Sequence, residues 1–113
     1  MTLQAANRML ETDEEGYLLD PGQWDRDVAA VIAKTEGIVM TDHHWLVVDF
    51  VRRYYEERMA VPEARTLLKY IKETLGEDKA TRKFVYQLFP YGYGQQACKI
   101  AGMRKPKKLM LDV

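Results

Sequence analysis

The feature that most constrains the fold of this chain is an apolar stripe at helical spacing. Between residues 62 and 75, apolar side chains recur at i, i+3, i+4, i+7 and i+11: Ala64, Leu67, Leu68, Ile71 and Leu75. This spacing places them on one face of an α-helix, whereas a strand would need alternation of period two. Pro62 suits the first turn of the helix, and Gly76 stands where a left-handed C-cap belongs. A helix with one apolar face must pack against other elements, so the segment predicts a helical domain.

Two helices are predicted before this one. The first opens with Asp20 as a cap and Pro21 in its first turn, and it ends at Gly37. The second is capped by Thr41, and its apolar stripe is wide: Trp45, Leu46, Val47, Val48, Phe50, Val51 and Tyr54. A stripe of this width is typical of the central, most buried helix of a small bundle.

Two more helices are predicted after it. One is capped by Asp78 and stopped by Pro90, and with the helix over 62–75 it has the outline of a helix-turn-helix. Helix pairs with a short turn are common in helical domains, and the net charge of the chain is zero, so packing is favoured over DNA binding for this pair. The last helix is expected from about Gln95 to Ala101.

The N-terminal residues have short apolar pieces separated by turn-forming residues, which predicts a β-hairpin over about 1–20. The fold class is therefore mostly α (α+β), a small orthogonal helical bundle with an N-terminal hairpin. One domain is expected over 1–102, with its helices over about 21–102. Residues 103–113 are expected to form a flexible, basic C-terminal arm, because Pro106 prevents a regular helix there.

Composition restricts the class of protein. Cys98 is the single cysteine among 113 residues, which excludes an internal disulfide and fits a reducing cytosol. The longest apolar runs are too short to cross a bilayer. A net charge of zero gives no bulk attraction to nucleic acid or to anionic membranes. We therefore expect a cytoplasmic, single-domain protein without membrane contact.

The adjacent histidines His43 and His44 are the first candidate for a site. Neighbouring helical positions point about 100° apart, so the two rings cannot easily share one metal ion. No further ligand stands at a suitable spacing. We interpret them as polar residues of a first helical turn, and neither a metal nor a cofactor is expected.

Cys98 is the second candidate. On a helical wheel it falls about 100° from the centre of the buried face, at the boundary between core and water. A helix N-terminus and Lys99 next to it would both favour the thiolate over the thiol. This placement predicts a partly exposed, reactive cysteine, while a buried structural cysteine stays an open alternative. A surface for partner binding is expected in the cations that follow it: Lys99, Arg104, Lys105, Lys107 and Lys108.

Several stretches of the chain resemble one known family. "QWDRDVAAVIAKTEGI", "HHWLVVDFVRRYYEE", "VYQLFPYG" and above all "QQACKIAGMRKPKK" follow, in order, the pattern of the DsrC/TusE family of sulfur-relay proteins, which includes the gamma component of dissimilatory sulfite reductase. The resemblance implies a helical domain with an N-terminal hairpin and a mobile C-terminal arm. It also implies sulfur carriage, either for thiolation of a tRNA wobble uridine or in sulfite reduction and sulfur oxidation.

The chain departs from the family pattern at the arm. Members end in a penultimate arm cysteine that carries the sulfur, and Leu109 aligns with it here. Cys98 aligns with an upstream cysteine that only DsrC-type members carry, which attacks the sulfur on the arm. Whether the chain is still an enzyme of the sulfurtransferase or sulfur-carrier type is therefore open.

Two functions follow from the resemblance. In the first, Cys98 acts as a persulfide or resolving thiol among other sulfur-relay proteins or with a sulfite reductase complex. In the alternative, the chain is a non-catalytic regulatory or nucleic-acid-binding paralogue that uses the helix-turn-helix and the basic arm, with tRNA or DNA as the ligand.

Overall fold

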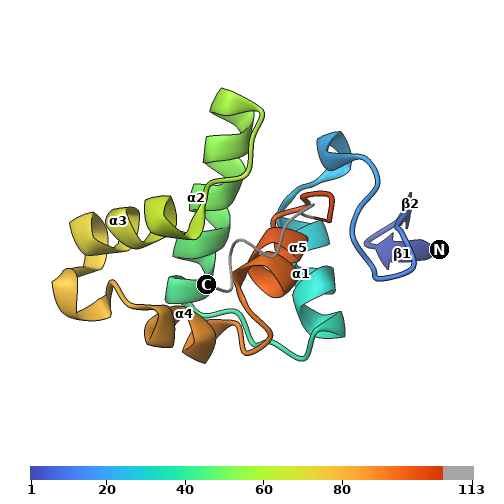
Figure 1. Ribbon diagram of the computed structural model, residues 1–113. Helices are drawn as coiled ribbons and strands as arrows, with labels where there is room; N and C mark the ends of the chain where they lie inside the picture. The colour runs from blue at the N-terminus through green and yellow to red at the C-terminus, as the bar shows by residue number, and fades with distance from the viewer. Residues whose placement is uncertain (106–113) are drawn as a thin grey trace.

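The computed structural model describes residues 1–105 and has the predicted mostly helical architecture with an N-terminal hairpin (Figure 1). Its elements are β1 Thr2–Ala5, β2 Arg8–Glu11, α1 Arg26–Thr35, α2 Asp42–Arg58, α3 Ala64–Leu75, α4 Arg82–Leu88 and α5 Cys98–Ile100. Short turns of other helical types complete the fold: 3-10 turns at Pro21–Gln23 and Glu77–Lys79, and a π-helical turn at Tyr93–Ala97.

The short helix α5 lies in the middle of the molecule. In Figure 1 the hairpin is at one end and the pair α3 and α4 is at the other, with α5 between α1 and α2. Both α1 and α2 contact α5, and α1 also contacts β1. The segment that carries Cys98 is therefore covered by elements from distant parts of the sequence.

The hairpin is short and regular. Its strands are antiparallel, with Thr2 opposite Glu11 and Ala5 opposite Arg8, so the chain reverses at residues 6–7. Ala5 and Leu10 are buried in the core, which ties the hairpin to the helices.

The predicted cap of α2 is confirmed. Thr41 and His44 form a reciprocal capping box at the start of this helix. Burial on α2 is concentrated on one side, at His44, Val47, Val48, Val51 and Arg52. The predicted wide stripe is therefore only partly buried, since Trp45, Leu46, Phe50 and Tyr54 are half-buried, and α5 rather than α2 is the most buried helix.

Two other predicted caps are wrong. Asp20 caps only the 3-10 turn at Pro21–Gln23, and the helix α1 starts later, where the Asp25 side chain accepts a hydrogen bond from the Val28 amide. The cap of α4 is Thr81, whose hydroxyl accepts from the Phe84 amide at 3.1 Å. Asp78 lies instead in the 3-10 turn at Glu77–Lys79. In both places the residue predicted to cap the helix belongs instead to a short 3-10 turn that precedes the helix.

The third helix starts at Ala64, after Glu63 as its N-cap, so Pro62 lies just before the helix and not in its first turn. The C-terminal region departs further from prediction. A regular helix was expected from about Gln95, but the chain forms the π-helical turn first and only then the three-residue α5.

Met103 is buried in the core, so the packed part of the chain continues past residue 102, where the flexible arm was expected to begin. Residues 106–113 of that arm lie outside the described residues. No helix within residues 1–105 combines the length and apolar character needed to cross a bilayer.

Candidate functional site around Cys98

Cys98 is completely buried, so the prediction of a partly exposed thiol is wrong. The wheel that placed it at a boundary assumed a regular α-helix, and the π-helical turn at Tyr93–Ala97 changes the angular position of every residue after it. In addition, residues 96–103 are all buried, so this segment has no solvent face on which a wheel could place the thiol.

The surroundings of Cys98 keep its thiol protonated. Burial raises the pKa of Cys98 from an ordinary value of 9.0 to about 12. The thiol lies within hydrogen-bonding reach of the Tyr93 hydroxyl, and that hydroxyl donates its proton to the Pro62 carbonyl oxygen at 2.7 Å. Since the Tyr93 proton is already used, the thiol is the donor toward Tyr93. In this conformation the thiol form of Cys98 is favoured over the thiolate, which is the nucleophilic form.

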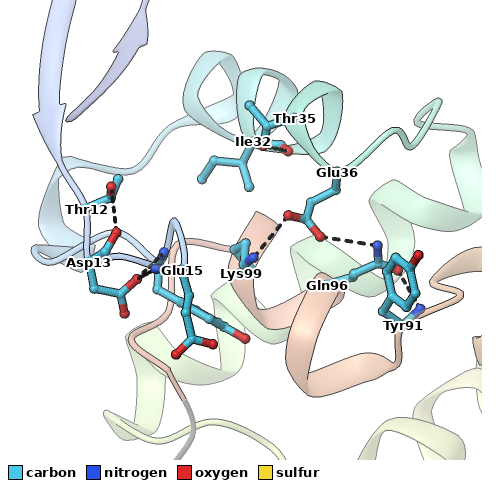
Figure 2. A network of polar contacts seen from close by, with 10 residues as sticks. Thr12, Asp13, Glu15, Ile32, Thr35, Glu36, Tyr91, Gln96 and Lys99 are labelled. Carbon is cyan, nitrogen blue, oxygen red and sulfur yellow. Dashed lines mark hydrogen bonds and ion pairs between the residues drawn. The ribbon is translucent and has the colours of Figure 1, made fainter. Parts of the chain in front are cut away.

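Lys99 is buried beside Cys98 and does not face solvent, contrary to its predicted place among the partner-binding cations. Its Nζ donates to Glu36 Oε2 at 3.0 Å, and the other oxygen of Glu36 accepts from Gln96 Nε2 at 3.2 Å (Figure 2). The amide oxygen of Gln96 in turn accepts from the Tyr91 backbone amide at 2.9 Å. The Lys99 Nζ also lies 4.7 Å from the centre of the Tyr17 ring. This network attaches both turns around Cys98 to the end of α1.

Two further side chains hold the end of α5. Trp24 Nε1 donates to the Ile100 carbonyl oxygen at 2.7 Å, and Arg52 Nη1 donates to the Ala101 carbonyl oxygen at 3.3 Å. The Arg52 guanidinium also lies over the Trp24 ring, 4.8 Å from its centre. These contacts satisfy carbonyl groups that a helix end leaves without intrahelical partners.

Two of the predicted arm cations begin the arm and contact the body of the protein. The Lys105 ammonium forms an ion pair with Glu15, and Arg104 Nη1 donates to the Leu19 carbonyl oxygen at 3.4 Å. Both side chains are exposed. Lys107 and Lys108 lie outside the described residues. The structure thus separates the predicted site residues, because Cys98 and Lys99 are buried while Arg104 and Lys105 are on the surface.

Both histidines make contacts within the protein core or at its edge, as expected for structural residues. His44 Nδ1 accepts from the Thr41 amide at 3.1 Å, which makes Nε2 the donor to the Leu88 carbonyl oxygen at 2.8 Å. Burial lowers the pKa of His44 and favours this neutral form. His43 points elsewhere and contacts the Phe84 ring edge-on. Within residues 1–105, no three His, Cys, Asp or Glu side chains come together in a group that could hold a metal ion.

Sequence reasoning missed Glu36, Gln96, Tyr93 and Arg52. One signal was available for Glu36, which stands at the C-cap of α1, where the helix dipole disfavours a carboxylate. A nearby cation offsets this unfavourable interaction, and Lys99 is that cation. Nothing in the sequence pattern pairs Tyr93 with Pro62, because the two are brought together only by packing of the π-helical turn against the loop before α3.

The comparisons with known proteins agree with this fold. A family model described as DsrC like protein matches residues 4–110. The chain is 43% identical over 106 residues to "Sulfurtransferase TusE" of Pectobacterium atrosepticum, covering 94% of this chain and 97% of the relative. It is 46% identical over 99 residues to "Sulfurtransferase TusE" of Escherichia coli strain K12, covering 88% and 91%.

Two solved structures are similar over nearly their whole length. The oxidised gamma-subunit of dissimilatory sulfite reductase from Archaeoglobus fulgidus has a TM-score of 0.89 and 32% identity, covering 96% of this chain and 98% of the other. Allochromatium vinosum DsrC has a TM-score of 0.84 and 40% identity, covering 95% and 96%. The family match and the identities to its members agree, and this chain is a member of the DsrC/TusE family of sulfur-relay proteins.

Proposed function

We propose that this chain takes part in sulfur relay by binding relay partners, and that it does not carry sulfur on its own thiol. The observation that carries the proposal is the burial of Cys98, whose pKa is raised to about 12. Attack on a persulfide or disulfide needs an accessible thiolate, and this thiol is neither accessible nor ionised at neutral pH. The sequence contains no second cysteine that could replace it.

The partners we propose are those that the family resemblance implies, namely other sulfur-relay proteins or a sulfite reductase complex. The surface proposed for docking includes Arg104 and Lys105, which are exposed at the base of the arm, and Lys107 and Lys108 follow them in the sequence. Lys99 is not part of this surface, because its ammonium is paired internally with Glu36.

A second candidate is that Cys98 handles sulfur after a local opening of the fold. The observation that favours it is the π-helical turn immediately before Cys98, since such turns are frequent at functional sites. This function requires a local opening that exposes the thiol, because Cys98 is completely buried in the described conformation.

Intact-mass measurement after incubation with a persulfide donor separates the two candidates. The native chain should gain no sulfur, whereas a persulfide would make it about 32 Da heavier. Leu109→Cys is the matched control, because it restores a thiol at the arm position and should take up the sulfur. A gain of that mass by the native chain that disappears in Cys98→Ala would overturn the proposal in favour of the second candidate.

A further inference from the structure

A groove of about 240 Å³ lies between α2 and α3. In Figure 1, α3 starts beside α2 and runs away from it, and side chains of both helices line the groove. Three cations and three aromatic rings are among them: Arg53, Arg58, Lys69, Phe50, Tyr54 and Tyr70. Arginine and aromatic side chains are enriched at the centres of protein-binding surfaces.

The three cations of this groove have no carboxylate partner in the described part of the chain. All three side chains are exposed, and no Asp or Glu oxygen of residues 1–105 lies within 4.0 Å of their nitrogen atoms. The cations near the base of the arm differ in this respect, since Arg52 is paired with Glu56 and Lys105 with Glu15. The groove between α2 and α3 therefore presents positive charge that is available to a ligand.

Aromatic rings hold the two arginines of the groove in place. The rings of Phe50 and Tyr70 are stacked, with their centres 4.2 Å apart. Arg53 Cζ lies 5.6 Å from the centre of the Tyr70 ring, and its guanidinium is within hydrogen-bonding reach of the Tyr70 hydroxyl. Arg58 Cζ lies 5.0 Å from the centre of the Tyr54 ring. Because the two guanidinium groups are already ordered, binding of an anion costs less side-chain entropy.

The spacing of the arginines restricts the shape of the ligand. Arg53 and Arg58 are five residues apart on α2, which is about 7.5 Å along the helix axis. Two acids at positions i and i+2 of an extended segment point to the same side and lie about 6.7 Å apart. We propose that the groove binds an extended acidic segment of a protein partner, with one carboxylate against each arginine. Lys69 adds positive charge from the opposite wall.

Two acids in the groove favour a protein segment over a nucleic acid. Glu57 and Glu73 line it together with the cations. A nucleic-acid strand carries a negative charge on every nucleotide, so its phosphates would also meet these carboxylates. A protein segment can place a neutral or basic residue opposite them. The volume agrees, since it is below the roughly 300 Å³ at which small-molecule pockets begin and is sufficient for a few side chains.

This binding goes beyond the proposed function. None of the cations of the arm lines the groove between α2 and α3. The binding also does not depend on whether Cys98 carries sulfur. The mass measurement described above and the titrations described below can therefore fail separately.

Peptide titrations of the full chain test the proposal. The probes are Gly-Glu-Ser-Glu-Gly and its neutral counterpart Gly-Gln-Ser-Gln-Gly, both with blocked ends, and binding is followed by the backbone amide NMR signals. The glutamate peptide should shift the signals around Arg53, Arg58 and Lys69, and the glutamine peptide should not. The double variant Arg53→Gln/Arg58→Gln should raise the dissociation constant of the glutamate peptide at least about tenfold, because it removes both charge-assisted contacts.

The double variant Lys34→Gln/Lys83→Gln is the matched control. It removes the same two charges from exposed positions outside the groove, and it should change the dissociation constant by less than about threefold, since salt screens distant surface charges. All four substitutions are at exposed positions, and thermal unfolding checks that both variants stay folded.

Three results would overturn the proposal. The first is the absence of any shift with the glutamate peptide, or equal shifts with both peptides. The second is an equal loss of affinity in the two double variants, which would mean unspecific charge attraction. The third is tighter binding of a uridine pentamer than of the glutamate peptide, lost in the arginine variant, which would assign the groove to nucleic acid.

Discussion

The residues around Cys98 determine both the accessibility of its thiol and its pKa. Its thiol is fully buried, lies against the Tyr93 hydroxyl and has a pKa raised to about 12. A free cysteine in such a place packs as a small hydrophobe with a weak donor. The nearby Lys99 does not change this, because its charge is compensated by Glu36 at 3.0 Å.

Ionisation of the Cys98 thiol should contribute to the pH dependence of stability. The pKa of Cys98 is raised from 9.0 in the unfolded chain to about 12 in the fold, so between these values only the unfolded state loses the proton. Ionisation then favours the unfolded state, and the free energy of unfolding should fall as pH rises through this window. The slope contributed by Cys98 should approach about 1.4 kcal/mol per pH unit.

Urea unfolding of the native chain and of Cys98→Ala at several pH values checks this expectation. The variant should lose stability less steeply than the native chain above pH 9, while the two should run parallel at neutral pH. The comparison of slopes removes the constant cost of the substitution itself. Parallel slopes up to pH 11 would mean that the thiol ionises in the folded protein and is therefore accessible.

Gly102 provides a second prediction at the residue scale. A Cβ at this position would lie 2.4 Å from Trp24 Cδ1, and its φ of 79° is in the left-handed region. Gly102→Ala should therefore lower the free energy of unfolding by more than about 3 kcal/mol. Gly37→Ala is the matched control, because Gly37 has a φ of 72° with open space around it and should cost only about 1 kcal/mol. Similar costs in urea titrations would show that the Trp24 ring can move aside.

At the scale of elements, α5 owes its position to partners far away in the sequence. Three residues are too few to form a stable helix alone, so tertiary contacts must hold it. Glu36 at the end of α1 binds both Gln96 and Lys99, and Trp24 and Arg52 bind the last carbonyl groups. The π-helical turn and α5 therefore form one unit with α1.

The network around Glu36 should contribute measurably to stability. Glu36→Gln leaves the Lys99 ammonium, whose side chain is 11% exposed, without its counter-ion. We expect the free energy of unfolding to fall by about 2–4 kcal/mol. Glu63→Gln breaks the exposed ion pair with Arg65 and should cost no more than about 0.5 kcal/mol. If the two variants unfolded at the same urea concentration, the network would be no stronger than a surface pair.

At the scale of the whole molecule, the boundary between body and arm lies beyond Gly102. Met103 is in the core, and its backbone amide donates to the Cys98 carbonyl oxygen at 3.0 Å. Arg104 and Lys105 then contact the loop that follows the hairpin, at Leu19 and Glu15. The body of the protein thus includes the first residue that the sequence had assigned to the arm.

Two truncations locate this boundary. A chain ending after Lys105 should lose less than about 1 kcal/mol of unfolding free energy, because it keeps the buried Met103 and the contacts that Arg104 and Lys105 make with the body. A chain ending after Gly102 should lose at least about 2 kcal/mol, because it lacks the buried Met103 side chain. Thermal unfolding of both chains provides the measurement. Equal transition temperatures would place the boundary where the sequence pattern had put it.

The sequence by itself determined the mostly helical fold, the hairpin, the cap at Thr41 and the family. These follow from local patterns, because apolar spacing defines a helix face and a cap needs only residues within one turn. The loss of the arm cysteine at Leu109 and the presence of a single thiol can also be read from the sequence directly.

Only the tertiary structure decided whether Cys98, Lys99 and Met103 are accessible. A helical wheel gives the direction of a side chain around its own helix axis, but burial depends on what covers that direction. Here α1 and α2 enclose α5, and the π-helical turn rotates the residues that follow it. The same packing brings Glu36 to Lys99 across 63 positions of sequence, and it directs the Tyr93 hydroxyl proton to the Pro62 carbonyl oxygen. The one thiol of this chain is therefore part of its core.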